Sequence, residues 1–325
     1  MMSIRFHGKR IFIYILFPYY LEFAVLPFFR YNVVRKVMKE DFMPSHYAHY
    51  YFGKEVIRVM PEDVKDIINT DETSIDAYMM GLHGPDFLAF YRPWRHNALN
   101  REGKRVHQEP GRNFFENAAL QLKDHPSSGA YSYIFGCITH FILDASCHPL
   151  VTEYMAETGL SHAKIEREFD NYILRICRKS PKRVNLRKVF PHSDKIDRLM
   201  SDFYTGTTPK NTREAIDTMT QVLAIFASKK SSVRKAAYNT LSLIPSQSVK
   251  SRRDMIYQDK EEPLAESSNV KLFDALNKAV MIASREMDHF MDYVLLGTPL
   301  NDNFDFNYLG RIPSETASDV ESRNK

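Results

Sequence analysis

The sequence predicts an all-α fold, organised as a single multi-helix domain. Apolar residues recur at helical spacing in several long segments, whereas the strict alternation typical of half-buried strands is scarce. The chain has 325 residues, of which 44% are apolar and 26% charged, so it can bury a sizeable core and is neither disordered nor collagen-like. The three cysteines, Cys137, Cys147 and Cys177, are too few for a disulfide framework.

The predicted helices are justified by their start signals, apolar stripes and stop signals. Pro61 followed by two acids marks a helix start, because proline and first-turn acids favour a helix N-terminus. Ser161 can cap the helix that follows it, and Gly297 with Pro299 ends the last one. Further helices are predicted at 111–122, 131–151, 162–176, 194–205, 212–228, 231–242 and 271–296, with loops at 92–112 and 246–269.

Three segments are expected: a leader over 1–42, the helical domain over 43–313 and a disordered tail over 314–325. The leader holds seven Lys/Arg against three acids, so the formal net charge of +4 resides there and the body is neutral. A neutral body disfavours a broad basic face, and no stable nucleic-acid partner is expected.

The apolar stretch 11–29 of the leader has two interpretations. It is long enough to span a bilayer and follows Lys9 and Arg10, which favours a membrane anchor. Pro18 and Pro27 interrupt it, however, and no small-residue cleavage site follows. The alternative is that the leader is a mis-assigned extension and that translation starts at Met43, in which case a cytoplasmic location is expected.

Histidines and acids are arranged with metal-ligand spacing in the first half of the chain. His140, Asp144 and His148 are each four residues apart, so they share one face of an otherwise apolar helix. His162 and Glu166 repeat the spacing on the next predicted helix. One such pair alone is usually a surface contact, but two pairs with an intervening histidine favour a metal, which would offset the cost of burying the Asp144 carboxylate.

Further candidate ligands lie upstream. Asp86 follows a predicted turn at Gly84-Pro85, and His107 falls in the predicted polar loop. His46 and His49 lie in the segment Met43-Pro44-Ser45-His46-Tyr47-Ala48-His49. His96 and His46 are alternatives to His107 and His49, and His83 is expected to orient a ligand.

Residues 43–180 resemble the zinc-dependent phospholipase C family, whose helical fold is shared with single-strand-specific zinc nucleases. The resemblance is carried by His140-x3-Asp144, by His148, by His162-x3-Glu166, and by the Gly-Pro-Asp and Tyr-Ala-His-Tyr-Tyr-Phe-Gly segments. It implies a site for two to three zinc ions. The implied ligands are His49, Asp86, His107, His140, Asp144, His148, His162 and Glu166.

The resemblance also implies how these ligands divide. Asp86, His107, His140 and Asp144 would bind one zinc, and Asp144 would bridge to a second, held with His49 and the chain's N-terminal amine. His148, His162 and Glu166 would bind the third. The amine requirement supports a start at Met43 with Pro44 as the first retained residue.

The expected function is zinc-dependent phosphodiester hydrolysis of the phospholipase C type, with a metal-activated water attacking phosphorus. Asp86 and Asp144 are the expected catalytic residues, Asp86 as a ligand or as a general base toward that water. The expected substrate is a phospholipid or another phosphodiester, with peripheral membrane contact, for which the basic stretch 175–195 is one candidate surface. The alternatives are a nuclease on the same fold and a non-catalytic zinc-binding helical protein.

Overall fold

The computed structural model describes residues 2–6, 9–13, 46–93, 95–180, 189–245 and 247–313. The helices of the body are α2 (His46–Val59), α3 (Glu62–Ile68), α4 (Glu72–Gly81), α5 (Ala98–Gln108), α6 (Gly111–Asp124), α7 (Ser128–Thr158), α8 (His162–Ile176), α10 (Asp194–Ser201), α11 (Pro209–Phe226), α12 (Ser231–Ser242), α13 (Gln247–Asp254) and α14 (Glu266–Leu296). Short 3-10 helices are η3 (Asp86–Phe90), η5 (Pro263–Ala265) and η6 (Asp302–Asp305). The prediction of an all-α body is therefore confirmed.

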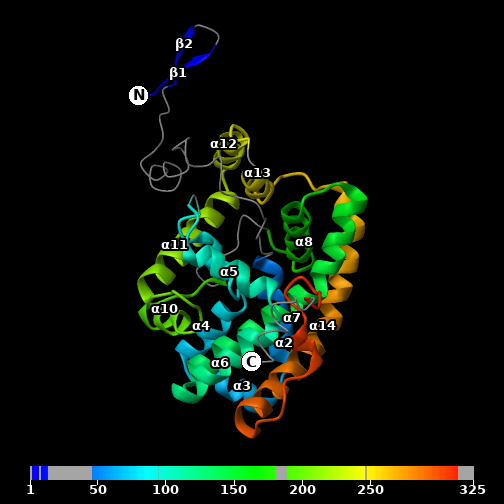
Figure 1. Ribbon diagram of the computed structural model, residues 1–325. Helices are drawn as coiled ribbons and strands as arrows, with labels where there is room; N and C mark the ends of the chain where they lie inside the picture. The colour runs from blue at the N-terminus through cyan, green and yellow to red at the C-terminus, as the bar shows by residue number, and fades with distance from the viewer. Residues whose placement is uncertain are drawn as a thin grey trace.

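The long helix α7 forms the centre of the body, with α2, α4, α8 and α14 packed around it (Figure 1). The Ser127 side chain caps its N-terminus by accepting a hydrogen bond from the Ala130 N–H at 3.1 Å. Its other end is Gly159, whose φ of 69° is the left-handed conformation that favours glycine. Its apolar residues are buried over most of its length, so α7 carries the core.

Helices α4 and α7 approach backbone to backbone at two glycines. A Cβ added at Gly136 would lie 2.3 Å from the Tyr78 carbonyl oxygen, and one at Gly81 would lie 2.2 Å from the Tyr133 carbonyl oxygen. No side chain fits either contact, because real Cβ atoms do not approach so closely. This close approach brings the turn that follows α4 directly against the middle of α7.

Two loop predictions were wrong. The segment 92–112 contains α5, whose N-terminus is capped by the Asn97 side chain accepting from the Asn100 N–H at 3.0 Å. The buried face of α5 includes Glu102, Gly103 and His107, and such a face escapes an apolar-periodicity test. The segment 246–269 likewise contains α13 and the start of α14. Helices α2 and α4 were not predicted.

The leader contains two short strands, β1 (Met2–Phe6) and β2 (Lys9–Ile13), which pair antiparallel. The remainder of the predicted anchor after Ile13, the predicted start at Met43 and the tail 314–325 lie outside the described residues. Within the described part of the chain, α7 has the length and hydropathy of a membrane span, but 72% of its most apolar window is buried in the bundle.

Candidate metal centre

The structure gathers the eight predicted ligands into three groups in which potential ligand atoms lie within 4.8 Å of one another. The groups are His49, His140 and Asp144; Asp86, His107 and His140; and His148, His162 and Glu166. His140 belongs to two of them. The grouping joins helices α2, α5, α7 and α8 with the N-terminus of η3.

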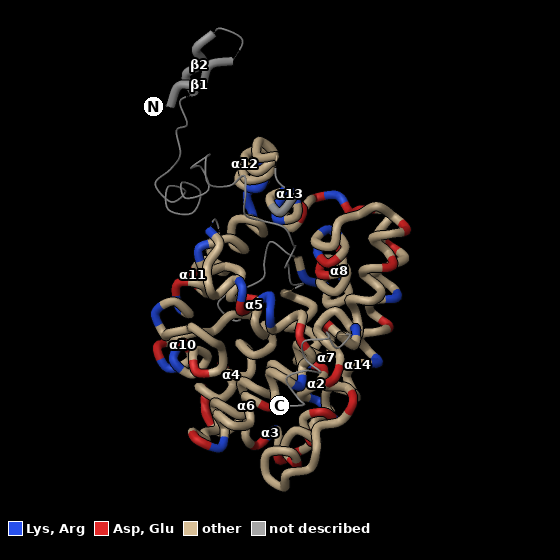
Figure 2. Tube along the Cα trace, in the orientation of Figure 1, with Lys and Arg blue, Asp and Glu red and all other residues tan. Residues whose placement is uncertain are grey.

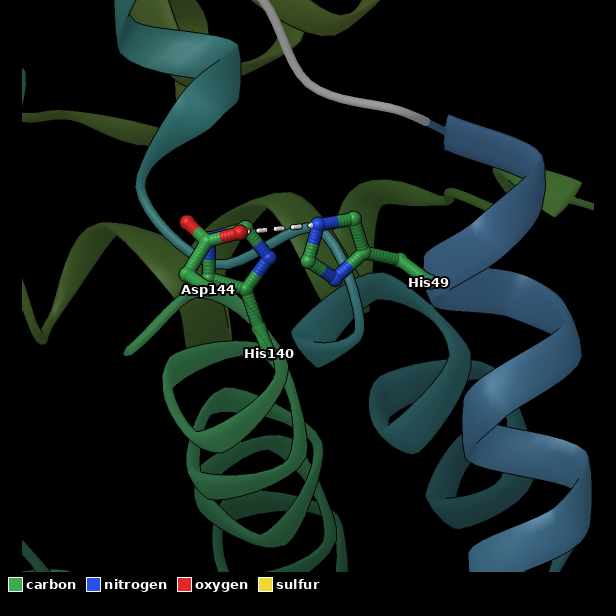
Figure 3. A group of neighbouring side chains, drawn as sticks. All are labelled: His49, His140 and Asp144. Atoms are coloured by element: carbon green, nitrogen blue, oxygen red, sulfur yellow. Dashed lines mark ion pairs between the residues drawn. The ribbon is translucent and has the colours of Figure 1, made fainter. Parts of the chain in front are cut away.

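Asp144 contacts two histidines of different helices, whose neighbouring rings lie on the same side of its carboxylate (Figure 3). Its Oδ1 is 3.1 Å from Nε2 of His49 on α2, and its Oδ2 is 3.3 Å from Nε2 of His140 on α7. The two imidazole rings are stacked with centroids 4.3 Å apart. Each carboxylate oxygen therefore faces its own imidazole nitrogen, an arrangement in which one carboxylate can serve two close metal ions.

Asp86 lies near the same His140 nitrogen as Asp144 and also faces His107. Its Oδ1 is 3.0 Å from Nε2 of His107, and its Oδ2 is 3.9 Å from Nε2 of His140. Asp86 is the first residue of η3, directly after the turn that α4 presses against α7. The fold thus explains how a residue 54 positions before His140 becomes its neighbour.

The third group spans the end of α7 and the start of α8. Glu166 Oε1 is 3.0 Å from Nε2 of His162 and 3.5 Å from Nε2 of His148. The Ser161 side chain caps α8 by accepting from the Lys164 N–H at 3.3 Å, as predicted. His162 and Glu166 consequently lie one turn apart at the first turns of α8 and face α7.

Backbone carbonyls hold three of the rings by their Nδ1 atoms. Nδ1 is 2.7 Å from the Gly103 carbonyl oxygen in His107, 3.2 Å from that of Leu82 in His140, and 2.6 Å from that of Tyr308 in His148. A ring that donates from Nδ1 presents a lone pair at Nε2, which is the form a metal ligand requires. In all three residues Nε2 is the atom that faces the carboxylates.

The electrostatics favour the ionised form of two of the carboxylates, because the pKa values of Asp144 and Glu166 are both lowered. Burial raises the pKa of Asp144, but the charges of His140, His148 and His49 outweigh it and hold the pKa well below its usual value. For His148, burial lowers the pKa, whereas Asp144 and Glu166 outweigh it and raise the pKa to about 9. Metal binding at His148 therefore displaces a proton.

Gly84 explains why the turn before Asp86 can lie so close to His140. Its φ is 46°, and an added Cβ would lie 2.5 Å from Cδ2 of the His140 ring. Two features of this position therefore require glycine: its left-handed backbone conformation and its close contact with the His140 ring.

Gly84→Ala is expected to reduce the amount of zinc bound per chain, and any zinc-dependent activity, at least about tenfold. The reason is that the new methyl group must displace the His140 ring. The matched control is Gly159→Ala, which has a φ of 69° but nothing within 4 Å of the added Cβ. It carries the same cost of about 1–2 kcal/mol for the left-handed residue without the contact. Zinc per chain and unfolding temperature are measured for both. Equal zinc loss in the two variants would contradict the role given to Gly84.

His46, His83 and His96 fall outside the three groups. His46 is buried, neither ring nitrogen has a hydrogen-bond partner among the described residues, and its ring is 5.8 Å from that of His83. Burial lowers the pKa of His46 to about 4, so the ring is neutral at pH 7. His83 lies against Phe190, with Nε2 3.1 Å from the Val189 carbonyl oxygen. His96 is exposed.

Tyr308 is the neighbour of these groups that sequence reasoning missed. Its ring centroid lies 4.9 Å from that of His107 and 5.6 Å from that of His140. Its carbonyl oxygen is the hydrogen-bond partner of His148 Nδ1. Gly310 secures this segment against α7, since an added Cβ would lie 2.3 Å from the Ala145 carbonyl oxygen. That carbonyl lacks its usual helical partner, because Pro149 has no N–H. No motif around Tyr308 signals the contact.

A comparison with known protein families adds an independent observation. The sequence profile described as zinc dependent phospholipase C matches residues 48–215, more than half of the chain. The chain belongs to the zinc-dependent phospholipase C family. All eight residues of the three groups lie within the matched region, whereas Tyr308 and helices α12 to α14 lie beyond it. No curated protein and no solved structure gives a significant match.

The groups have the chemistry that a member of the zinc-dependent phospholipase C family needs. Imidazole nitrogens and carboxylate oxygens are the ligands zinc accepts. Asp86 Oδ2, His140 Nε2 and Glu166 Oε2 are buried and make no hydrogen bond within the described part of the chain. Buried polar atoms without partners are costly, and each of the three groups contains at least one residue with such an atom. The residues present therefore fit a metal.

Proposed function

We propose that the protein is a phosphodiester hydrolase of the phospholipase C type, that it acts on phospholipid, and that it uses two to three zinc ions held by the three groups. The observation that carries the proposal is the position of the Asp144 carboxylate, with one oxygen 3.1 Å from His49 and the other 3.3 Å from His140. Bound at such a site, zinc supplies Lewis acidity to a phosphoryl oxygen and makes a water a nucleophile near neutral pH.

The chain itself supplies the position and the ionisation state of every ligand. Asp144 would bridge the groups of His49 and His140, and Asp86 would join His107 to His140, with both carboxylates near His140 Nε2. The carbonyls of Gly103 and Leu82 hold the two rings against rotation. We assign Asp86 a ligand role, because both of its oxygens face histidine nitrogens.

Hydrolysis of phosphatidylcholine, phosphatidylinositol and single-stranded DNA by the zinc-loaded full chain tests the proposal. We expect release of the phosphorylated head group from at least one lipid, loss of that activity with a chelator, and recovery on adding zinc. Cleavage of DNA without lipid cleavage would favour the nuclease alternative. A zinc-loaded protein that cleaves none of the three would favour the non-catalytic alternative.

A further inference from the structure

Helices α12 and α13 form a strongly basic end of the molecule. Between Asp217 and Asp254 the sequence has seven Lys/Arg and no acidic residue. Figure 1 shows the two helices beside each other at one end of the body, and Figure 2 shows their Lys and Arg segments there. The body from Met43 onward is formally neutral, so this end departs from the charge balance of the rest of the molecule.

Most of these basic side chains are exposed at the surface and are not part of the core. Lys229, Lys230, Lys235 and Lys250 are exposed. Arg234 differs, since it is 4% exposed and binds the carbonyls of Tyr257 and Ser228. We define the exposed lysines, together with Tyr238 and Leu243, as the α12–α13 surface.

Apolar side chains project from the same surface. Leu243, in the turn after α12, is 75% exposed, and Tyr238 is 37% exposed with the Arg253 guanidinium 5.0 Å from its ring centroid. Leucine and tyrosine among lysines are typical of a surface that enters the interface of a bilayer, where head groups meet the charges and the apolar groups reach the acyl region. Surfaces for single-stranded nucleic acid depend on aromatic side chains that stack on bases, whereas the most exposed apolar side chain of this surface is a leucine.

An apolar crevice lies directly beneath this surface. Its volume is about 50 Å³, and it is lined by side chains from α11, α12 and α13 and by Phe90, Pro93 and Met255. The lining includes Ala237 and Leu241 of α12. The ring of Phe90 lies 6.4 Å from that of His46, on the helix that carries His49. Apolar contacts therefore connect the α12–α13 surface with the neighbourhood of the metal centre.

We propose that the α12–α13 surface docks the protein on anionic phospholipid bilayers, with the lysines binding head groups and Leu243 inserting below them. The proposal that the protein docks on a bilayer depends only on the α12–α13 surface. The idea that docking presents lipid to the metal centre rests in addition on the proposed function. An anionic bilayer is the favoured occupant because the surface combines four exposed lysines, a projecting leucine and an adjacent apolar crevice. The surface lies beyond the region matched by the family profile.

Sedimentation of the full chain with lipid vesicles tests the proposal. We expect the protein to bind vesicles of phosphatidylcholine with 30% phosphatidylglycerol at least tenfold more tightly than pure phosphatidylcholine vesicles, and to dissociate as salt rises. The triple variant Lys229→Gln, Lys230→Gln, Lys235→Gln is expected to bind about a hundredfold more weakly, from roughly fivefold per lysine.

Matched controls separate the surface from total charge and total hydrophobicity. Lys123→Gln, Lys210→Gln, Lys278→Gln removes the same charge from exposed positions of α6, α11 and α14 and is expected to keep binding within about twofold. Leu243→Ser is expected to weaken binding several-fold, whereas Leu296→Ser, also at 75% exposure, is not.

Three outcomes would overturn the proposal: no binding of the unaltered protein to anionic vesicles, equal binding to neutral vesicles, or equal loss in the two lysine triples. Binding of single-stranded DNA through the same lysines, without vesicle binding, would assign the surface to nucleic acid instead. Hydrolysis of a soluble phosphodiester, such as bis-(p-nitrophenyl) phosphate, is measured alongside. The first triple variant should retain it, so a protein that docks but never hydrolyses would contradict the proposed function and not the docking.

Discussion

Asp144→Asn is expected to lower phosphodiester hydrolysis by at least about a thousandfold, whereas Glu166→Gln should lower it by only about tenfold. The difference of two orders of magnitude corresponds to about 2.7 kcal/mol of transition-state stabilisation. Asp144 has an oxygen facing each of two histidines that belong to overlapping groups, so its replacement removes a ligand from both. Glu166 faces only the separate third group.

The comparison is matched in chemistry, since both changes replace a buried carboxylate by its isosteric amide. Hydrolysis rates are measured with zinc in excess, together with zinc per chain and the unfolding temperature. We expect Asp144→Asn to lose more zinc than Glu166→Gln while both remain folded. Equal, modest losses of activity would argue that no carboxylate bridges two metals.

Removal of zinc is the second change with a large expected effect. The purified protein is expected to carry two to three zinc ions, and exhaustive chelation should abolish hydrolysis and lower the unfolding temperature by about 10 °C. Asp86, Asp144 and Glu166 are buried, and the three groups take their ligands from η3, α2, α5, α7 and α8, so bound metal would add links between these packed elements. A ligand at a thousand times its Kd stabilises by about 4 kcal/mol, which supports an estimate of this size.

Elemental analysis and thermal unfolding check this expectation. Readdition of zinc should restore both the activity and the unfolding temperature, and magnesium should restore neither, because imidazole-rich sites disfavour it. Less than one zinc per chain after zinc-replete expression would contradict the assignment of the three groups as zinc sites. An unfolding temperature that is the same before and after chelation would show that the stability of the fold does not depend on metal.

The sequence determined the local geometry of the candidate site. The four-residue spacing of His140, Asp144 and His148 in an apolar segment places them on one face of a buried helix, and α7 has that arrangement. The spacing of His162 and Glu166 does the same for α8. These predictions succeeded because helical periodicity depends only on neighbours along the chain.

Helix α5 shows where that reasoning fails. Its inward face consists of Leu99, Glu102, Gly103, Val106 and His107, and three of the five are not apolar. Glu102 is satisfied by Arg105 and the Thr205 N–H, while His107 faces Asp86. A helix whose buried residues serve hydrogen bonds and a candidate site lacks the apolar stripe by which a helix is recognised.

Only the tertiary structure decided which ligands face one another. The glycine contact between α4 and α7 puts Asp86 beside His140, and the returning C-terminal segment puts Tyr308 beside His107 and His148. The α12–α13 surface with its apolar crevice likewise requires three helices and Phe90 to meet. Such contacts join residues far apart along the chain, and their partners are selected by packing of the whole core, which no local pattern encodes. The residue types and their spacing thus defined a metal-binding chemistry, and the packing of the helices brought its parts together.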